Sequence, residues 1–196
     1  MATHPPTHWL TEAGMFFEKS GPLWETLRNL EARLQDAQIP YVIIGGLALN
    51  AYNYPRQTQD ADVVVRDADF QRFKDRFGRE YEPRKGAPRR FADMRTEAWV
   101  DFLIAGEIAG NRRKNRVVRF PDPSEGEIRN DLRTVSLPRL IELKLVTWRY
   151  KDWGDVVELI RRNQLPESVA DQMDASVRSA YLQCYDQANE ETYDAG

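Results

Sequence analysis

Three aspartates are the residues of this sequence whose type and spacing best fit a chemical role. Asp60 and Asp62 are one residue apart at the start of an apolar, β-branched run that ends at Val65. Because side chains alternate along a strand, both carboxylates would lie on one face, within reach of a single cation. Such close carboxylates repel each other unless a divalent metal lies between them. The pair therefore indicates a metal site.

The third acid, Asp101, lies in an otherwise apolar run from Ala98 to Ile104 that predicts a buried strand. A carboxylate surrounded by apolar side chains costs several kcal/mol unless it is paired or bound to metal. An Arg or Lys partner is the structural alternative. The same tripeptide recurs as Asp67-Ala-Asp69, where a helical pattern follows, so we interpret that copy as a helix N-cap and a first-turn acid.

Two glycines, Gly45 and Gly46, follow the apolar run Tyr41–Ile44 and precede a short helical segment, Leu47–Tyr52. A strand-to-helix turn of this kind presents backbone N–H groups at a helix start, and the missing Cβ atoms let a phosphate approach closely. A tight turn without any ligand explains the glycines equally well. Both histidines, His4 and His8, precede the first predicted helix, so histidine-based catalysis has no suitable residues. Metal-assisted phosphoryl or nucleotidyl transfer is the leading remaining chemistry.

Composition predicts a protein with one ordinary core. The chain has 196 residues, a formal net charge of -3 and one cysteine, Cys184, which indicates a reducing compartment and hence the cytoplasm. No signal peptide or membrane-spanning run is visible. We predict a flexible segment over 1–21, a core over 22–137, C-terminal helices packed on the core over 138–188, and a frayed tail over 189–196.

Apolar periodicity predicts the elements that position these residues. Alternating strands and helices open the chain, residues 80–96 are mostly charged, and short strands are predicted at 117–120 and 132–135. Helices are predicted from Pro22, from Pro138, over 152–160 and over 166–188. This order predicts an α/β (α+β) fold with a small mixed sheet flanked by helices.

The run from Val42 to Ala48, the pattern Arg56-x-Thr58-x-Asp60-x-Asp62 and the isolated Asp101 resemble the nucleotidyltransferase superfamily of DNA polymerase beta. A later segment, with Lys144 and Arg149-x-Lys151-Asp152-x-x-Asp155, resembles the nucleotidyltransferases that act as toxins in type IV toxin–antitoxin and abortive-infection systems. The resemblance implies a nucleotidyltransferase fold with a C-terminal helical segment. It also implies an enzyme that moves a nucleoside monophosphate from a nucleoside triphosphate to an acceptor hydroxyl on RNA, a tRNA end, a protein or a small molecule, and a cognate antitoxin as a partner.

The resemblance further implies a role for each site residue. Mg²⁺ or Mn²⁺ would be held by the three acids, Asp60, Asp62 and Asp101, and the triphosphate by the glycine turn. By position, Lys144 would reach the triphosphate, and Arg56 and Thr58 would line the same pocket. Without the resemblance, Lys144 is better explained as a lysine that extends to solvent.

Two alternatives remain open. The chain could be a non-catalytic nucleotide-binding or antitoxin-like module that kept the fold, although the presence of all three acids argues against this. It could instead bind RNA without nucleotide chemistry through a basic stretch, for which a solvated loop is the ordinary explanation; its residues are Arg112, Arg113, Lys114, Arg116 and Arg119. The aromatic residues from Trp148 to Trp153 are interpreted as core.

Overall fold

Seven strands form one sheet in this computed structural model, which describes residues 19–110 and 117–190. The strand order is β3-β4-β5-β2-β1-β7-β6. Strands β2 and β5, and strands β1 and β7, pair in parallel, whereas the other neighbours are antiparallel. The strands are β1 (Val42–Ile44), β2 (Asp60–Val65), β3 (Tyr81–Arg84), β4 (Ala87–Asp93), β5 (Trp99–Ile104), β6 (Glu127–Arg129) and β7 (Leu132–Thr134).

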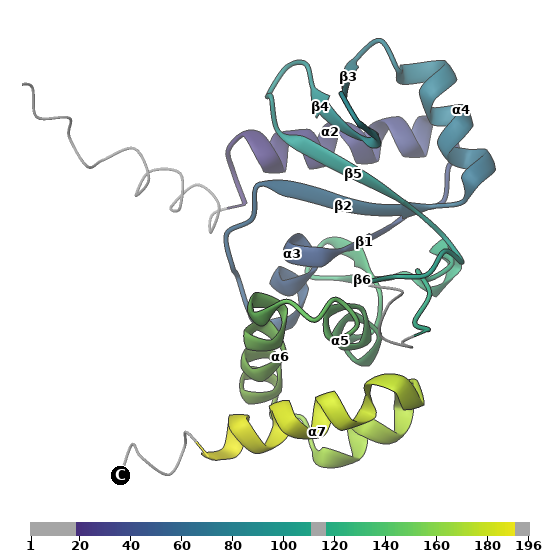
Figure 1. Cartoon of the computed structure of the whole chain (residues 1–196). Helices are drawn as coiled ribbons and strands as arrows, with labels where there is room; N and C mark the ends of the chain where they lie inside the picture. The colour runs from purple at the N-terminus through teal and green to yellow at the C-terminus, as the bar shows by residue number, and fades with distance from the viewer. Residues whose placement is uncertain (1–18, 111–116, 191–196) are drawn as a thin grey trace, which may run out of the picture.

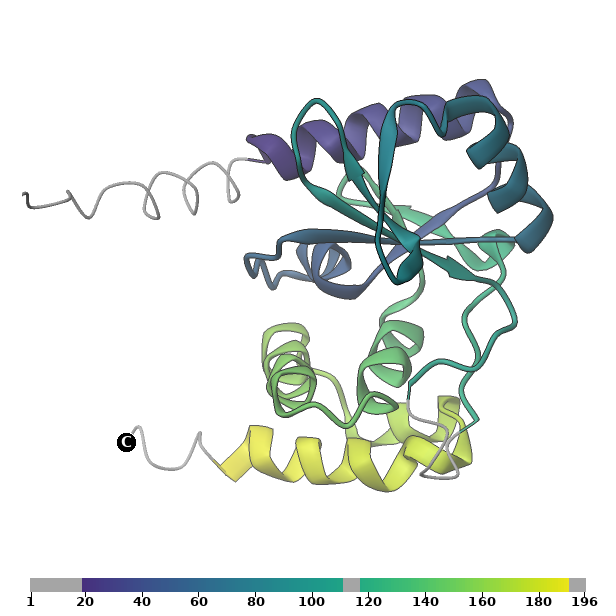
Figure 2. The same cartoon turned by 45° about the horizontal axis from the view of Figure 1, so that its top comes forward.

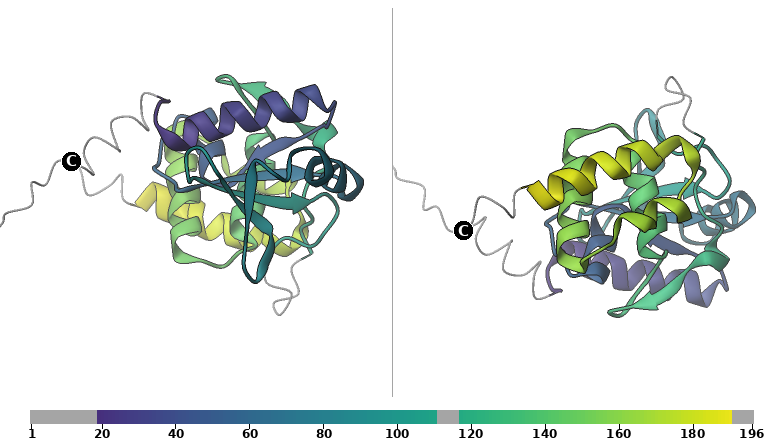
Figure 3. Two further views of the ribbon diagram at one scale, coloured as in Figure 1. Left: turned by 90° about the horizontal axis from the view of Figure 1, so that it is seen from above. Right: turned by 90° about the horizontal axis from the view of Figure 1, so that it is seen from below.

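Helices cover both faces of this mixed sheet, so the predicted fold class is confirmed. The helices are α2 (Pro22–Asp36), α3 (Gly45–Ala48), α4 (Asp67–Phe77), α5 (Leu137–Leu145), α6 (Tyr150–Asn163) and α7 (Ala175–Glu190), with short 3-10 helices η1 (Leu49–Tyr52), η3 (Pro123–Glu125) and η4 (Glu167–Gln172). Helices α2 and α4 lie on one side of the sheet, and α5, α6 and α7 on the other (Figures 1 and 2). Seen from above and below, α2 and α7 form the outer layers (Figure 3).

Strand alternation divides the core into two clusters, one on each face. Val63 of β2 and Phe102 of β5 pack with the apolar residues of α2 and α4. Val64 of β2 packs on the opposite face with Leu140 of α5 and Tyr181 of α7. The C-terminal helices therefore share a hydrophobic cluster with the sheet.

Three local predictions are wrong. The segment 117–120 contributes only an isolated bridge from Arg119 to Ile108, while the charged stretch 80–96, for which no element was predicted, forms the β3–β4 hairpin. The last predicted helix is broken into η4 and α7. Asp67 lies inside α4, whose N-cap is Arg66, so it is a first-turn acid rather than a cap. Within the described residues, no helix is long and apolar enough to cross a membrane.

Candidate active site

The three acids lie on one face of the sheet, at the N-terminal ends of two neighbouring strands. Asp62 of β2 is in register with Asp101 of β5, and Asp60 is in register with Trp99. Because β2 and β5 are parallel and in register, the side chains of Asp62 and Asp101 point to the same side, as does that of Asp60 two residues earlier. This is the face that α5 and α6 cover (Figure 1).

The glycine turn lies directly beside Asp62. Ile44, the last residue of β1, is in register with Asp62, and Gly45 follows with φ of 69°. A Cβ atom on Gly45 would be 1.9 Å from Asp62 Oδ2, and one on Gly46 would be 2.7 Å from Thr58 Oγ1. Both glycines are therefore required by close packing, and Gly45 also by its left-handed backbone.

Of the three acids, Asp62 has the most strongly shifted pKa. Burial raises the pKa of its carboxyl group to about 7, and the negative charges of Asp60 and Asp101 add to this effect, while Lys144 and Arg149 partly offset it. Within the described residues, no hydrogen bond or ion pair reaches its carboxylate. This carboxylate therefore has no cationic group in contact with it among the described residues, and a strongly perturbed pKa in a cleft is typical of functional sites.

Asp101 and Asp60 share an arginine that the sequence did not identify. Arg90 of β4 is in register with Asp101, and its Nη1 atom lies 2.8 Å from Asp101 Oδ2. Its Nη2 atom lies 3.4 Å from Asp60 Oδ2. Burial raises the pKa of Asp101, and Arg90 partly counteracts this rise. Arg90 thus supplies the ion-pair partner that a half-buried acid on β5 was expected to need.

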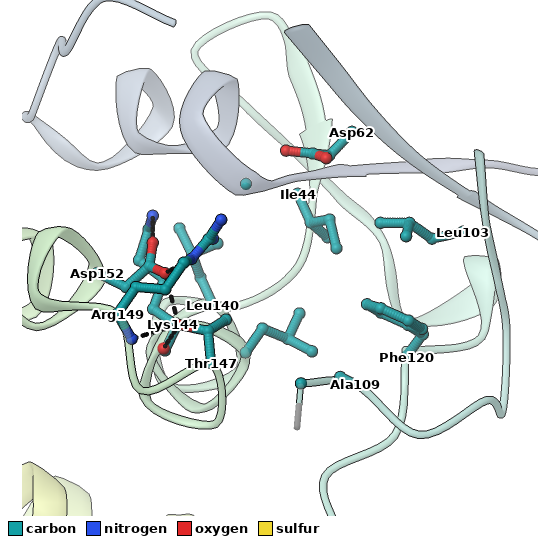
Figure 4. Close-up of a pocket in the computed structure, with 13 residues that line it drawn as sticks. Ile44, Asp62, Leu103, Ala109, Phe120, Leu140, Lys144, Thr147, Arg149 and Asp152 are labelled. Atoms are coloured by element: carbon teal, nitrogen blue, oxygen red, sulfur yellow. Dashed lines mark hydrogen bonds and ion pairs between the residues drawn. The ribbon is translucent and has the colours of Figure 1, made fainter. Parts of the chain in front are cut away.

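A pocket lies between the sheet and α5. Gly45 and Asp62 belong to its sheet wall, and Lys144, Arg149 and Asp152 belong to its helical wall. Figure 4 shows the Asp62 carboxylate on the side opposite Lys144 and Arg149. The remaining lining is mainly apolar. The pocket therefore combines an acidic end, a basic end and a low-dielectric wall, in which charges act strongly on one another.

Lys144 is buried in an ion network instead of extending to solvent. Its Nζ atom lies 2.7 Å from Asp155 Oδ2 and 3.4 Å from Asp152 Oδ1. Although burial opposes ionisation of Asp152, the Thr147 hydroxyl and the charges of Lys144 and Arg149 hold its pKa below the ordinary value. The α5–α6 connection is therefore fixed at the pocket by buried charges, which are costly to leave unpaired.

Arg56 and Thr58 lie outside this pocket. Arg56 Nε is 2.9 Å from Asp155 Oδ1, and Arg56 lines a separate hollow with Lys151. Thr58 donates a 2.9 Å hydrogen bond to Asp60 Oδ1. Thr58 nevertheless lies against Gly46 of the glycine turn, and a nucleotide contact by Arg56 and Thr58 stays a prediction. Of the basic stretch, only Arg119 is among the described residues, and it donates a hydrogen bond to the carbonyl oxygen of Gly106.

The donor chemistry of the three acids suits Mg²⁺ or Mn²⁺, which prefer carboxylate oxygens. In the described ranges, however, no three His, Cys, Asp or Glu side chains converge as a ready-made metal site. Arg90 occupies the space between Asp60 and Asp101 instead. The three acids therefore have the oxygen donors that such a metal needs and lie on one face of the sheet. Asp60 and Asp101 would have to release Arg90 to bind it.

No family model matches the chain, and no curated protein matches it in sequence. Among the solved structures that are similar, two are covered over most of their length. The antibiotic-resistance factor ANT(2'')-Ia is 14% identical, with 86% of this chain and 95% of that chain covered and a TM-score of 0.46. JHP933 from Helicobacter pylori is 13% identical, with 87% and 94% covered and a TM-score of 0.43.

Proposed function

We propose that this protein is a metal-dependent nucleotidyltransferase that moves a nucleoside monophosphate from a nucleoside triphosphate to an acceptor hydroxyl group. One observation carries the proposal. Asp62, which has no partner among the described residues, lies beside the glycine turn and faces Lys144 and Arg149 across a pocket. An acidic end suits divalent cations, and a basic end suits phosphates, so the two ends together suit a metal–triphosphate complex.

The acids would hold the metal. Asp62 and Asp101 are paired in register, and Asp60 is on the same face, so all three can turn their oxygens toward one region. When bound, Mg²⁺ or Mn²⁺ stabilises the negative charge that develops on the entering and leaving oxygens of an in-line displacement. The protein orients the acids, because β2 and β5 both lie in the central part of the sheet.

The remaining residues would bind and orient the triphosphate. Asp62 and Thr58 fill the places where Cβ atoms on Gly45 and Gly46 would lie, so the glycines let the turn pack against the strand of acids, and backbone N–H groups at the start of α3 would contact the phosphates. Arg149, more than half exposed, can leave Asp152 for a phosphate, whereas Lys144 is held by Asp152 and Asp155. We therefore assign the direct contact to Arg149, and to Lys144 the neutralisation of charge behind it.

Label transfer tests this proposal. The protein is incubated with each nucleoside triphosphate labelled at the α-phosphate, with Mg²⁺, and separately with protein, tRNA and small hydroxyl compounds. We expect label in one acceptor fraction, and none with Asp101→Asn. Binding of the triphosphate without transfer in any fraction would favour the non-catalytic module instead.

A further inference from the structure

One cationic side chain lies among the three acids. Arg90 contacts the Oδ2 atoms of both Asp60 and Asp101, and all three side chains are only 22–30% exposed. We propose that Arg90 is a resident counter-ion, which a divalent cation must displace before Asp60 and Asp101 can act as metal ligands. The inference rests on the proposed function, because it takes these acids as the metal ligands.

The competition follows from the number of oxygens available. Both oxygens of Asp60 are in use, because Oδ1 accepts the Thr58 hydroxyl and Oδ2 faces Arg90. A hard cation binds through the same carboxylate oxygens as a guanidinium group. Asp62 can accept a cation without losing any contact, whereas a cation that bridges Asp60 and Asp101 would lie against the positive charge of Arg90, which must therefore move.

Arg90 is held in a way that makes its departure feasible. Its Nε atom is buried and has no hydrogen-bond partner within the described residues, so one donor of the guanidinium group stays unsatisfied. The guanidinium group lies 5.2 Å from the centre of the Trp99 ring, which can retain a displaced arginine. Arg84 lies 5.7 Å from the same ring and makes no ion pair with a described acid, although its charge acts on Asp101 from a distance, so it is a control for the loss of a positive charge without the loss of an ion pair.

Manganese binding without nucleotide tests the inference. Isothermal titration calorimetry with Mn²⁺ alone is performed on the full chain and on Arg90→Gln and Arg84→Gln. Because removal of Arg90 frees two carboxylates, we expect about tenfold tighter binding by Arg90→Gln, equal to about 1.4 kcal/mol. Binding by Arg84→Gln should stay within about twofold of the wild type.

Equal or weaker Mn²⁺ binding by Arg90→Gln would overturn the inference and leave the proposed function intact, since the wild type would still bind metal. Absence of Mn²⁺ binding in both proteins would overturn the two together. Phenylglyoxal, which modifies free guanidinium groups, tests the wild type directly and avoids any folding defect of the variant. Peptide mass spectrometry should show Arg90 modified several-fold faster with Mn²⁺ than without it, and Arg84 unchanged. An unchanged or slower rate at Arg90 would contradict displacement.

Discussion

Replacing Asp62 with Asn should stabilise the metal-free protein at high pH and leave it unchanged at low pH. The pKa of Asp62 is raised from 3.8 to about 7 in the folded protein, because its charge is buried beside two other acids. Between these pH values the folded protein holds a proton that the unfolded chain has released. Stability therefore falls as the pH rises through this window, and the full penalty is present above pH of about 7.

The rise of this pKa from 3.8 to about 7 corresponds to about 4 kcal/mol, at about 1.36 kcal/mol for each tenfold change in proton affinity. The pocket admits water, and solvent screening reduces this value, so we expect about 2 kcal/mol. Asn has the shape of protonated Asp but cannot ionise. The gain for Asp62→Asn should therefore be about 2 kcal/mol at a pH of about 8, or roughly 4–8 °C in Tm for a chain of this size. It should fall to about 0.8 kcal/mol at a pH of about 5 and vanish only below a pH of about 3.8, where the unfolded chain is protonated too.

Thermal unfolding in the presence of a chelator, measured by circular dichroism at both pH values, provides the assay. Asp67→Asn is the matched control, because it changes an exposed acid of the second Asp-Ala-Asp tripeptide, in the first turn of α4. No pH-dependent gain is expected there. If Asp62→Asn destabilised the protein equally at both pH values, Asp62 would be an ion-pair partner in the fold, and the reasoning about an uncompensated carboxylate would be refuted.

Three further substitutions test other parts of the site. Gly45→Ala should lower the free energy of unfolding in urea by about 2 kcal/mol or more, because Gly45 has a left-handed backbone and a Cβ atom there would meet Asp62. Gly86→Ala, with φ of 79° and no atom within 4 Å of the added Cβ, should lower it by only about 1 kcal/mol. Equal losses would show that the contact with Asp62 contributes nothing. Lys144→Met should cost up to about 3–5 kcal/mol in free energy of unfolding, because Asp152 and Asp155 lose their shared buried cation and keep only Arg149 and Arg56. Asp155→Asn in the same chain should restore part of this loss. No recovery would show that the loss comes from packing and not from charge. Arg149→Gln should weaken binding of a non-hydrolysable triphosphate with Mg²⁺ about tenfold, measured by calorimetry. Lys151→Gln, outside the pocket, should weaken it less than about twofold. The reverse order would show that the phosphates bind beside Lys151 instead.

The strand positions of the three acids could be predicted from the sequence, because the patterns that mark them involve only neighbouring residues. Asp60 and Asp62 alternate along one strand, and Asp101 lies in an apolar run, so strand periodicity alone puts all three on definable faces. The glycine turn was equally visible, because a β-branched run ends directly at Gly45. These features depend on neighbours in sequence, which is why the central strands and α5 were predicted correctly.

Arg90 could not be predicted for the opposite reason. Its strand, β4, is mostly polar and lies next to β3 near the sheet edge, so only Phe91 and Asp93 are buried in it and no apolar alternation marks it as a strand. Its pairing with Asp101 is set by the register between β4 and β5. Lys144 is a similar case, because its acidic partners belong to the next helix.

The fate of the γ-phosphate tests the central claim most directly. With a nucleoside triphosphate labelled at the γ-phosphate, Mg²⁺ and the full set of acceptor fractions, nucleotidyl transfer releases labelled pyrophosphate, because the bond between the α- and β-phosphates breaks. We predict pyrophosphate from the wild type and none from Asp62→Asn or Asp101→Asn. Labelled orthophosphate as the product, or pyrophosphate release that persists in both variants, would contradict nucleotidyl transfer by these acids.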